Sequence, residues 1–500
     1  MISAFANTWR VPELRERIIF TLFMIVIVRL GVYIPLPGVD TSVIANWIDW
    51  KKNSESSGGP GDQLGAMFNI FSGGGLQNCG IFALGIMPYI SASIMMQLLS
   101  AVVPKLARLS KEDGGRQKIN QYTRFITIVI AIVQGFMLTK ALQNPGSIPF
   151  LQGIEEHGGG PLVPDPTFLW QLIVTLTIVA GALFIMWIGD QITDRGLGNG
   201  VSMIITVNII AALPGALVIA WQTFVGGSAG GFGALQLVFL IGFLLFVIAA
   251  TIAITQGQRR IAIQYAKRVV GRKMLGGQTQ YLPLKINYAG VMPIIFATAI
   301  LALPTFLLTT VFKGQPWANS LATAMVPGSL WYYIIAGLMI FFFSYFWVAT
   351  MFQPSQVAED LKRSGGYIPG VRPGQPTADF LDSTMSRLTF AGSIFLLIIF
   401  ILPYAVGETL NLNYLVTQFF GGTSLLIIVG VLLDFMRQVE THLIQRNYDG
   451  FLRKGKMKGG RYDSRGQNKQ VAASKGTGSV MILAFMAALI VLAAMALAMK

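Results

Sequence analysis

Long apolar runs recur along this chain and are separated by shorter polar stretches. A helix rises 1.5 Å per residue, so about 20 apolar residues cross a hydrocarbon layer of about 30 Å. Windows of this length predict eleven spans, at 18–36, 78–100, 121–142, 168–189, 199–220, 235–255, 287–312, 331–352, 388–406, 414–438 and 479–499. The pattern therefore predicts an all-α polytopic membrane protein.

The first apolar run follows three arginines, as a cleaved signal peptide would. It contains Arg29, however, and it ends in a Pro-Leu-Pro-Gly sequence without a small-residue cleavage site. We therefore interpret it as a retained first span.

One apolar run is too short to cross a membrane. Residues 64–71 precede a Ser-Gly-Gly-Gly sequence at 72–75, and glycines permit a sharp change of backbone direction. This pattern predicts a half-length re-entrant helix, which must be surrounded by protein or a water-filled cavity. The alternative is an interfacial helix on the outer surface.

Composition and charge agree with a membrane protein. Only 12% of residues are charged, against about 25% in soluble domains, while 53% are hydrophobic and the mean hydropathy is +0.61. If the N-terminus is cytoplasmic, the inner loops hold 30 of the 37 Lys and Arg residues, at 1–17, 104–124, 190–200, 256–286, 353–387 and 445–478. Because basic residues stay on the cytoplasmic side, this orientation is predicted.

Few residues in the spans suit catalysis or coupled ion transport. One cysteine and two histidines argue against a disulfide framework and a Cys or His metal site. Arg29, Asp434 and Arg437 are the ionisable exceptions, and snorkelling or helix pairing explains each as well as function does. No phosphate-binding loop is present either. We expect no enzymatic activity, no cofactor and no metal, so any energy must come from another protein.

Six stretches carry motifs that occur in the same order in one known family. They are FNIFSGG (68–74), IFALGIMPYISAS (81–93), GDQITDRGLGNG (189–200), GQRRI (257–261), GVRPG (370–374) and FGGTSLL (420–426). Through them the chain resembles the SecY family, the central channel subunit of the Sec protein translocon, over about residues 10–455.

The resemblance implies a ten-helix clamshell of two inverted five-helix halves, residues 1–225 and 226–445, with a plug helix at about 64–72. A basic cytoplasmic linker (446–478) and an additional C-terminal transmembrane segment (479–500) follow, and they depart from the family pattern. The role of that segment stays open between a peripheral anchor and a built-in accessory helix.

The resemblance also assigns roles to residues that would otherwise be interpreted as ordinary packing, helix-contact or topology-setting residues. The pore ring comprises Ile86, Ile90, Val201, Ile205, Ile295 and Ile427. The plug includes Met67, Phe68, Asn69, Ile70, Phe71, Gly73 and Gly74. Polar residues near the lateral gate are Ser91, Gln134 and Asn287. Docking residues for the motor and ribosome are Arg259, Arg260, Lys267, Arg268, Arg272, Lys273 and Arg372.

The implied function is a gated protein-conducting channel in the bacterial cytoplasmic (inner) membrane. It would pass unfolded, signal-bearing polypeptides across the membrane and release membrane segments sideways into the lipid bilayer. The implied partners are SecE-like and SecG-like small membrane subunits, the SecA motor ATPase and the ribosome. A solute transporter is the main alternative, since it also uses inverted repeats and broken helices, and an open-groove insertase is the second.

Overall fold

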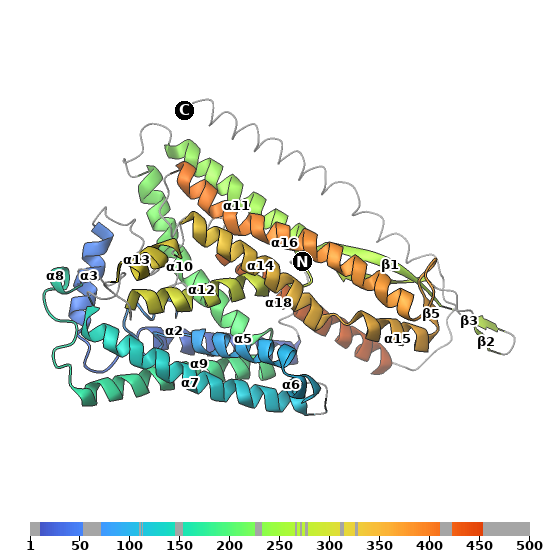
Figure 1. Ribbon diagram of the computed structural model, residues 1–500, viewed down its shortest axis with the longest axis horizontal. Helices are drawn as coiled ribbons and strands as arrows, with labels where there is room; N and C mark the ends of the chain where they lie inside the picture. Colours follow the sequence, from blue (N-terminus) through green and yellow to red (C-terminus); the bar gives the residue numbers. More distant parts are fainter. Residues whose placement is uncertain are drawn as a thin grey trace.

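Helices make up most of the part of the chain that the computed structural model describes (Figure 1). The described residues are 11–53, 72–109, 112, 114–145, 154–225, 233–265, 268–270, 273–275, 279–310, 315–325, 329–410 and 423–453. The predicted short helix at 64–71 and the predicted eleventh span at 479–499 lie outside these ranges.

A helix coincides with each of the first ten predicted spans. These helices are α2 (Pro12–Val32), α5 (Met87–Val102), α7 (Gly115–Gln143), α9 (Phe168–Arg195), α10 (Gly200–Val225), α11 (Gly233–Gln256), α12 (Met292–Thr310), α14 (Leu330–Met351), α16 (Gln375–Leu410) and α18 (Thr423–Arg453). Among the described residues, six helical segments are long and apolar enough to cross a membrane: Gln117–Gln143, Phe168–Arg195, Gly200–Ile219, Val238–Gln256, Leu330–Ser364 and Gln375–Gly407. Met87–Val102 and Met292–Leu301 are shorter apolar helices.

The second of the ten helices begins later than predicted. Residues 73–86 form turns rather than helix, and Gly73, Gly74 and Gly85 all have positive φ. Backbone hydrogen bonds tie these turns to the segment after α2, from Leu36 N–H to the carbonyl of Cys79 and from Ile81 N–H to the carbonyl of Ile34, both 2.9 Å. Hydropathy alone therefore overestimated the length of this helix, because the glycines direct the chain into another hydrogen-bonding pattern.

Within the described ranges, five shorter helices lie in the connections: α3 (Thr41–Asn53), α6 (Pro104–Leu109), α8 (Ile154–Gly158), α13 (Pro316–Ala324) and α15 (Pro354–Ser364). Proline within the first two positions of α13 and α15 suits a helix start, where the missing N–H would have no helical partner. Figure 1 shows α3, α8 and α13 at one end of the molecule and α15 at the other.

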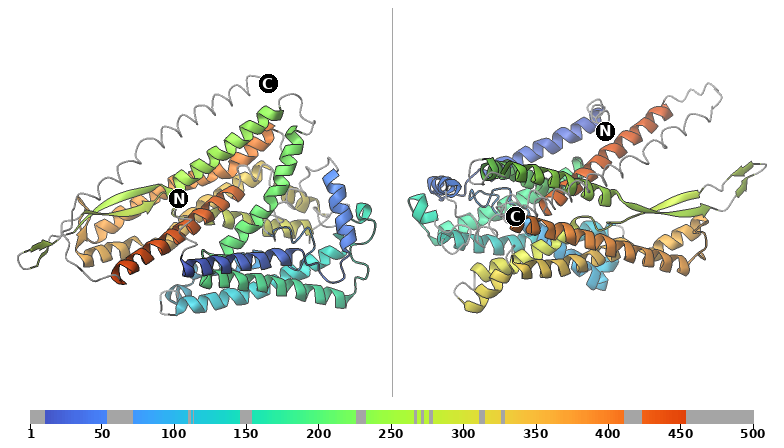
Figure 2. Two further views of the ribbon diagram at one scale, coloured as in Figure 1. Left: turned by 180° about the vertical axis from the view of Figure 1, so that it is seen from behind. Right: turned by 90° about the horizontal axis from the view of Figure 1, so that it is seen from above.

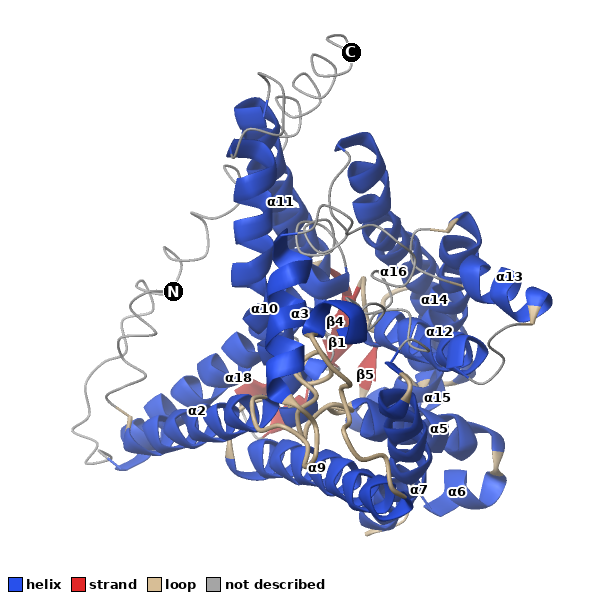
Figure 3. Cartoon of the chain, turned by 90° about the vertical axis from the view of Figure 1, so that its left-hand side faces the viewer, coloured by secondary structure: helices blue, strands red, loops and turns tan. Residues whose placement is uncertain are grey.

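The chain is not entirely helical, which corrects the all-α expectation. In the predicted loop 256–286, β1 (Gln258–Tyr265) pairs antiparallel with β4 (Thr279–Lys285), and β2 (Arg268–Val270) pairs with β3 (Lys273–Leu275). β5 (Gly366–Tyr367) pairs with the other edge of β1. Figure 2 shows the hairpin projecting beyond the helices, and Figure 3 shows the strands grouped behind them.

Buried residues alternate with more exposed ones along β1 of the hairpin, but the neighbouring charged residues hid this pattern in the sequence. Ile261 and Ile263 are buried, whereas Arg259 and Arg260 are exposed. Ile261 is buried in one cluster with Leu284 of β4 and Leu381 of α16, so one face of the hairpin packs against the helices. A sheet needs such a buried face to hold its register.

Among the ten long helices, the same sequence of helix-to-helix contacts occurs in two sets of five. In the first set α5 contacts α7, α7 contacts α9, α9 contacts α10, and α2 contacts both α9 and α10. In the second set α12 contacts α14, α14 contacts α16, α16 contacts α18, and α11 contacts both α16 and α18. The sets meet where α5 contacts α12 and where α10 contacts α11 and α18.

Candidate functional site

The candidate site is an apolar cluster between the two sets of helices. It contains five of the six predicted pore-ring residues as buried members, Ile86, Ile90, Ile205, Ile295 and Ile427. The sixth, Val201, is partly buried and packs against the cluster. The structure thus brings together residues that are up to 341 positions apart in sequence (86 to 427).

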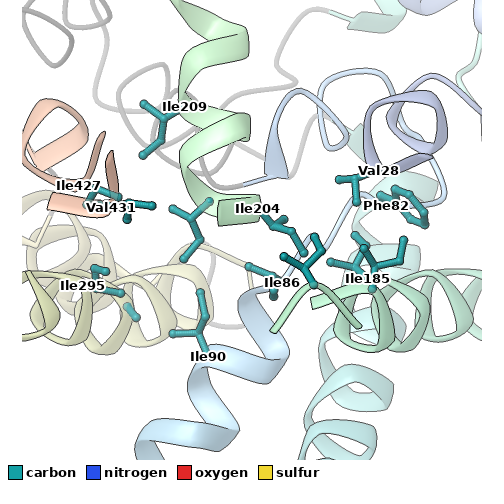
Figure 4. Packing of buried hydrophobic residues seen from close by; sticks show 14 of the residues in the cluster. Val28, Phe82, Ile86, Ile90, Ile185, Ile204, Ile209, Ile295, Ile427 and Val431 are labelled. Carbon is teal, nitrogen blue, oxygen red and sulfur yellow. The ribbon is translucent and has the colours of Figure 1, made fainter. Parts of the chain in front are cut away.

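Four helices supply these side chains. Ile86 directly precedes α5 and Ile90 lies in its first turn, where the N–H of Ile90 donates to the carbonyl of Ile86 at 3.1 Å. Val201 and Ile205 lie on one face of α10, and Ile295 and Ile427 come from α12 and α18. Figure 4 shows Ile86, Ile90, Ile295 and Ile427 around one region between these helices.

The cluster extends beyond the predicted ring. Ile204, Ile209 and Val431 are also buried in it (Figure 4). Ile209 and Val431 each follow a ring residue by four positions, so helical spacing could have identified them. All six ring side chains are branched and aliphatic, and they offer water no hydrogen bond. An empty constriction lined in this way can dewet and block ions.

The start of α10 is positioned by the glycine-rich turn after α9. Asn199 Oδ1 accepts hydrogen bonds from the N–H groups of Val201 (3.1 Å) and Ser202 (3.4 Å), as a helix N-cap does. A Cβ on Gly200 would overlap the carbonyl oxygen of Gly189. The GDQITDRGLGNG motif therefore fixes where α10 begins. The start of the helix in turn determines where Val201 and Ile205 lie relative to the other helices of the cluster.

Of the predicted plug, only Gly73 and Gly74 lie among the described residues; Met67, Phe68, Asn69, Ile70 and Phe71 do not. Gly73 and Gly74 have φ of +66° and +95°, which L side chains rarely adopt. Glycine therefore suits both of these positions, and the assignment of the plug itself stays a prediction.

The three predicted gate residues lie on or beside three helices, of which α5 and α12 contact each other where the two sets meet. Ser91 is on α5, Gln134 is on α7, and Asn287 precedes α12. The amide of Asn287 donates to the carbonyl of Gly290 at 3.1 Å, and within the described residues no hydrogen bond joins the three side chains to one another. Their role at a gate stays a prediction.

Both predicted docking loops meet at the projecting hairpin. Arg259 and Arg260 are exposed on β1, while Arg268 and Lys273 begin β2 and β3. Lys267 and Arg272 lie outside the described residues. Because β5 pairs Tyr367 with Gln264, the 353–387 loop is joined to this hairpin.

Arg372 is exposed in a turn that has a glycine with positive φ on each side of it and a hydrogen bond to its own carbonyl. Gly370 and Gly374 have φ of +84° and +107°, and the hydroxyl of Thr377 donates to the carbonyl of Arg372 at 2.8 Å. The side chain is thus presented to solvent from a fixed backbone. Among the described residues, no group of three or more His, Cys, Asp or Glu side chains is suited to a metal ion.

Comparisons with known proteins agree with this architecture. The SecY family model matches residues 80–436. The protein translocase subunit SecY of Streptomyces scabiei is 41% identical over 459 residues, which covers 91% of this chain and 100% of that protein. Its counterpart from Aquifex aeolicus is 42% identical over 448 residues, covering 89% of this chain and 98% of that protein.

The fold resembles solved channels at low sequence identity. A SecY structure described as having a plug domain that stabilises the closed state matches with a TM-score of 0.56 and 16% identity, covering 89% of this chain and 95% of that one. From its sequence relatives and the family model, the chain belongs to the SecY family of protein translocase subunits.

Proposed function

We propose that this chain is the central channel through which unfolded polypeptides cross the bacterial cytoplasmic membrane. The observation that carries the proposal is the apolar cluster where two similarly packed sets of helices meet. A constriction there can seal against ions by excluding water, and its side chains can move aside for a polypeptide of any sequence.

The repeated packing order supports two halves, residues 1–225 and 226–445, related by an inverted repeat. The N-terminus and the projecting hairpin face the cytoplasm, in agreement with the basic loops. Membrane segments leave between the halves where α5 contacts α12, with α7 and α14 beside them. An apolar client helix gains about 0.3 to 0.6 kcal/mol for each central Leu or Ile that enters the lipid.

The exposed basic residues of the hairpin, together with Arg372 of the joined loop, form the docking surface for the SecA motor and the ribosome. Lys and Arg side chains bind RNA phosphates and acidic protein surfaces without a deep pocket. SecE-like and SecG-like single-helix subunits complete the assembly. At the base of the hairpin, Ile261 and Leu284 are buried in one cluster with Val348 of α14 and Leu381 of α16, which anchors this surface to the helices.

Arg372→Glu is expected to reduce motor-driven transport at least about tenfold without loss of the protein from the membrane. Reversing a docking charge replaces attraction by repulsion, whereas exposed substitutions usually change stability by less than about 0.5 kcal/mol. The measurement is precursor translocation into inverted vesicles with SecA and ATP. Arg363→Glu is the matched control, because Arg363 lies outside this docking surface, is 79% exposed and, within the described part of the chain, pairs with Glu359 of its own helix at 3.5 Å. Equal loss in both variants would contradict a specific role for Arg372.

The additional C-terminal segment is proposed to span the membrane and leave Lys500 outside. Residues 480–499 carry no charge and are long enough to cross, and the nine basic residues between 446 and 478 hold the linker inside. A cysteine placed after Lys500 in a Cys79→Ser background is expected to react with a membrane-impermeant thiol reagent on spheroplasts. Ser474→Cys in the linker should react only after lysis. The same dependence on lysis at both positions would exclude the eleventh span.

Transport assays in reconstituted vesicles distinguish a protein-conducting channel from the alternative, a solute transporter. With SecA and ATP, we expect a signal-bearing precursor to become protease-protected inside them. Counterflow of a small solute without precursor transport would favour the transporter.

A further inference from the structure

A short helix between the seventh and eighth predicted spans has an exposed apolar face that the proposed function does not use. This helix is α13 (Pro316–Ala324), which contacts α12 and α14. Figure 3 shows it projecting to the side beyond both of these helices and away from α10. Residues 315–325 contain no Asp, Glu, Lys or Arg. A connecting helix that lay in water would instead be expected to turn polar and charged residues outward.

One row of α13 side chains packs against α12. Ala318 and Ala322 are buried, and they lie in one cluster with Leu308 near the C-terminal end of α12. Because residues four positions apart share a helix face, the two alanines form a single packed row. This contact fixes how α13 is turned about its own axis.

A second apolar row of α13 is exposed. Trp317 and Leu321 are also four positions apart, and their exposed fractions are 55% and 45%. Each directly precedes one of the buried alanines, so the two rows lie about a quarter turn apart on the helix. Together they form an apolar face that is wider than the part α12 covers. The exposed polar residues Ser320 and Thr323 lie outside this face.

The neighbouring surface of α14 indicates what covers the exposed row. α14 lies in one of the helical segments that are long and apolar enough to cross a membrane, and its Leu330, Ile334 and Leu338 side chains are exposed. On a membrane-spanning helix, such side chains face lipid. Because only residues 325–329 separate α13 from α14, the exposed row of α13 continues this lipid-facing surface at its end.

Exposed tryptophans mark the depth of α13 in the membrane. Trp331 lies in the first turn of α14 and Trp221 lies near the end of α10, and each is more than half exposed. In the proposed orientation both helix ends are on the outer side. Trp is enriched where acyl chains meet water, because its ring is apolar while its N–H is polar. α13 lies at the end of the molecule where α14 begins, so Trp317 belongs to the same level (Figure 1).

We propose that α13 lies in the outer lipid–water interface of the membrane, with Trp317 and Leu321 among the acyl chains and Thr323 facing water. The partner of its exposed row is therefore the lipid of the outer leaflet. Because α13 packs against α12, the interface also holds the outer end of the helix that supplies Ile295 to the apolar cluster. Only the choice of leaflet rests on the proposed function, through its orientation.

Fluorescent probes on two sides of α13 test this placement. A single cysteine replaces Leu321 or, as the matched control, Thr323 in the full-length Cys79→Ser chain, and it carries a nitrobenzoxadiazole dye in vesicles of phosphatidylethanolamine and phosphatidylglycerol. An interfacial helix buries its apolar face by about 5 to 10 Å, so lipids with a nitroxide near the headgroup should quench Leu321→Cys at least about twofold more than Thr323→Cys. Aqueous iodide should quench the two positions in the reverse order.

Substitution of Trp317 tests whether its ring anchors the helix. With the dye at Leu321→Cys, Trp317→Phe should keep the quenching by lipid nitroxides because an aromatic ring remains. Trp317→Gln should lower this quenching towards the value at Thr323→Cys and should increase quenching by iodide. Lipid quenching that stays at the parent level in Trp317→Gln would overturn the anchor.

Two further results would overturn the interfacial position. Equal iodide quenching at Leu321→Cys and Thr323→Cys would place α13 in water. Protection of Leu321→Cys from iodide without quenching by lipid nitroxides would mean that a second copy of the chain or another protein covers the exposed row.

The choice of leaflet is tested separately from the interfacial position. Thr323→Cys should react with a membrane-impermeant thiol reagent on spheroplasts, because the outer side is accessible there. Reaction only after lysis, together with lipid quenching at Leu321→Cys, would place α13 in the inner leaflet. That result would contradict the orientation in the proposed function and overturn the outer-leaflet assignment, while the contact of α13 with lipid would stand.

Discussion

Deleting residues 64–71 is expected to raise the resting ion conductance of the reconstituted channel roughly tenfold or more, while signal-bearing precursors still cross. The segment contains Leu64, Met67, Ile70 and Phe71, and burying even one such side chain contributes about 1.5 to 3 kcal/mol. Each 1.4 kcal/mol removed from the closed state shifts its population about tenfold. The deletion should therefore favour the open state of the channel while leaving the pore-ring residues unchanged.

The control is a deletion of equal length in the polar linker just before this segment. Residues 54–61 comprise Ser, Glu, Gly and Pro only, and their removal should leave the conductance at the parent level. Planar-bilayer recordings of both variants, with precursor translocation measured in parallel, give the comparison. An unchanged conductance after deletion of 64–71 would mean that this segment does not seal the channel.

Ile427→Asn is the second substitution with a large expected effect. The Ile427 side chain is 2% exposed in the apolar cluster, and an amide there gives water a hydrogen-bonding partner inside the constriction. We expect a leak at least about tenfold above the parent, together with transport of precursors whose signals are too weak for the parent channel. Burying the amide also costs about 1 to 3 kcal/mol of stability, so the amount of folded protein must be measured.

Two variants separate the seal from general damage to the fold. Ile427→Val keeps the ring apolar and removes one methylene, so it should cost only about 0.5 to 1.5 kcal/mol and preserve the seal. Leu432→Asn places the same amide on α18, but at a side chain that is 56% exposed. If Leu432→Asn leaks as much as Ile427→Asn, the cluster is not the constriction.

Hydropathy windows predicted the helices well because the bilayer imposes one length on every span. They failed at 78–86, where most residues are apolar but the chain forms turns that are hydrogen-bonded to the segment after α2. They also missed the hairpin, because the exposed Arg259 and Arg260 beside Ile261 and Ile263 concealed the alternation that defines its buried face.

The candidate site could be predicted only in part. An isoleucine that lines a ring has the same sequence pattern as one that packs between helices, so Ile86 and Ile427 were identified through the family motifs alone. No pattern of side chains in the sequence could have predicted the partner of Arg29, because the Arg29 side chain donates to the backbone carbonyl of Gly73. Contacts of this kind become visible only when the fold brings distant segments together.

The most direct test of a pore at the apolar cluster is whether a polypeptide in transit contacts cluster residues that belong to both halves of the protein. A precursor with one central cysteine is stalled in the channel, in a Cys79→Ser background that carries a single cysteine at Ile90, Ile205, Ile295 or Ile427. We predict that the precursor forms a disulfide with all four. A cysteine at Ile178, which is buried in a separate cluster between α7 and α9, should form none. Disulfides at Ile178 equal to those at the ring, or none at the ring, would contradict a pore at this position.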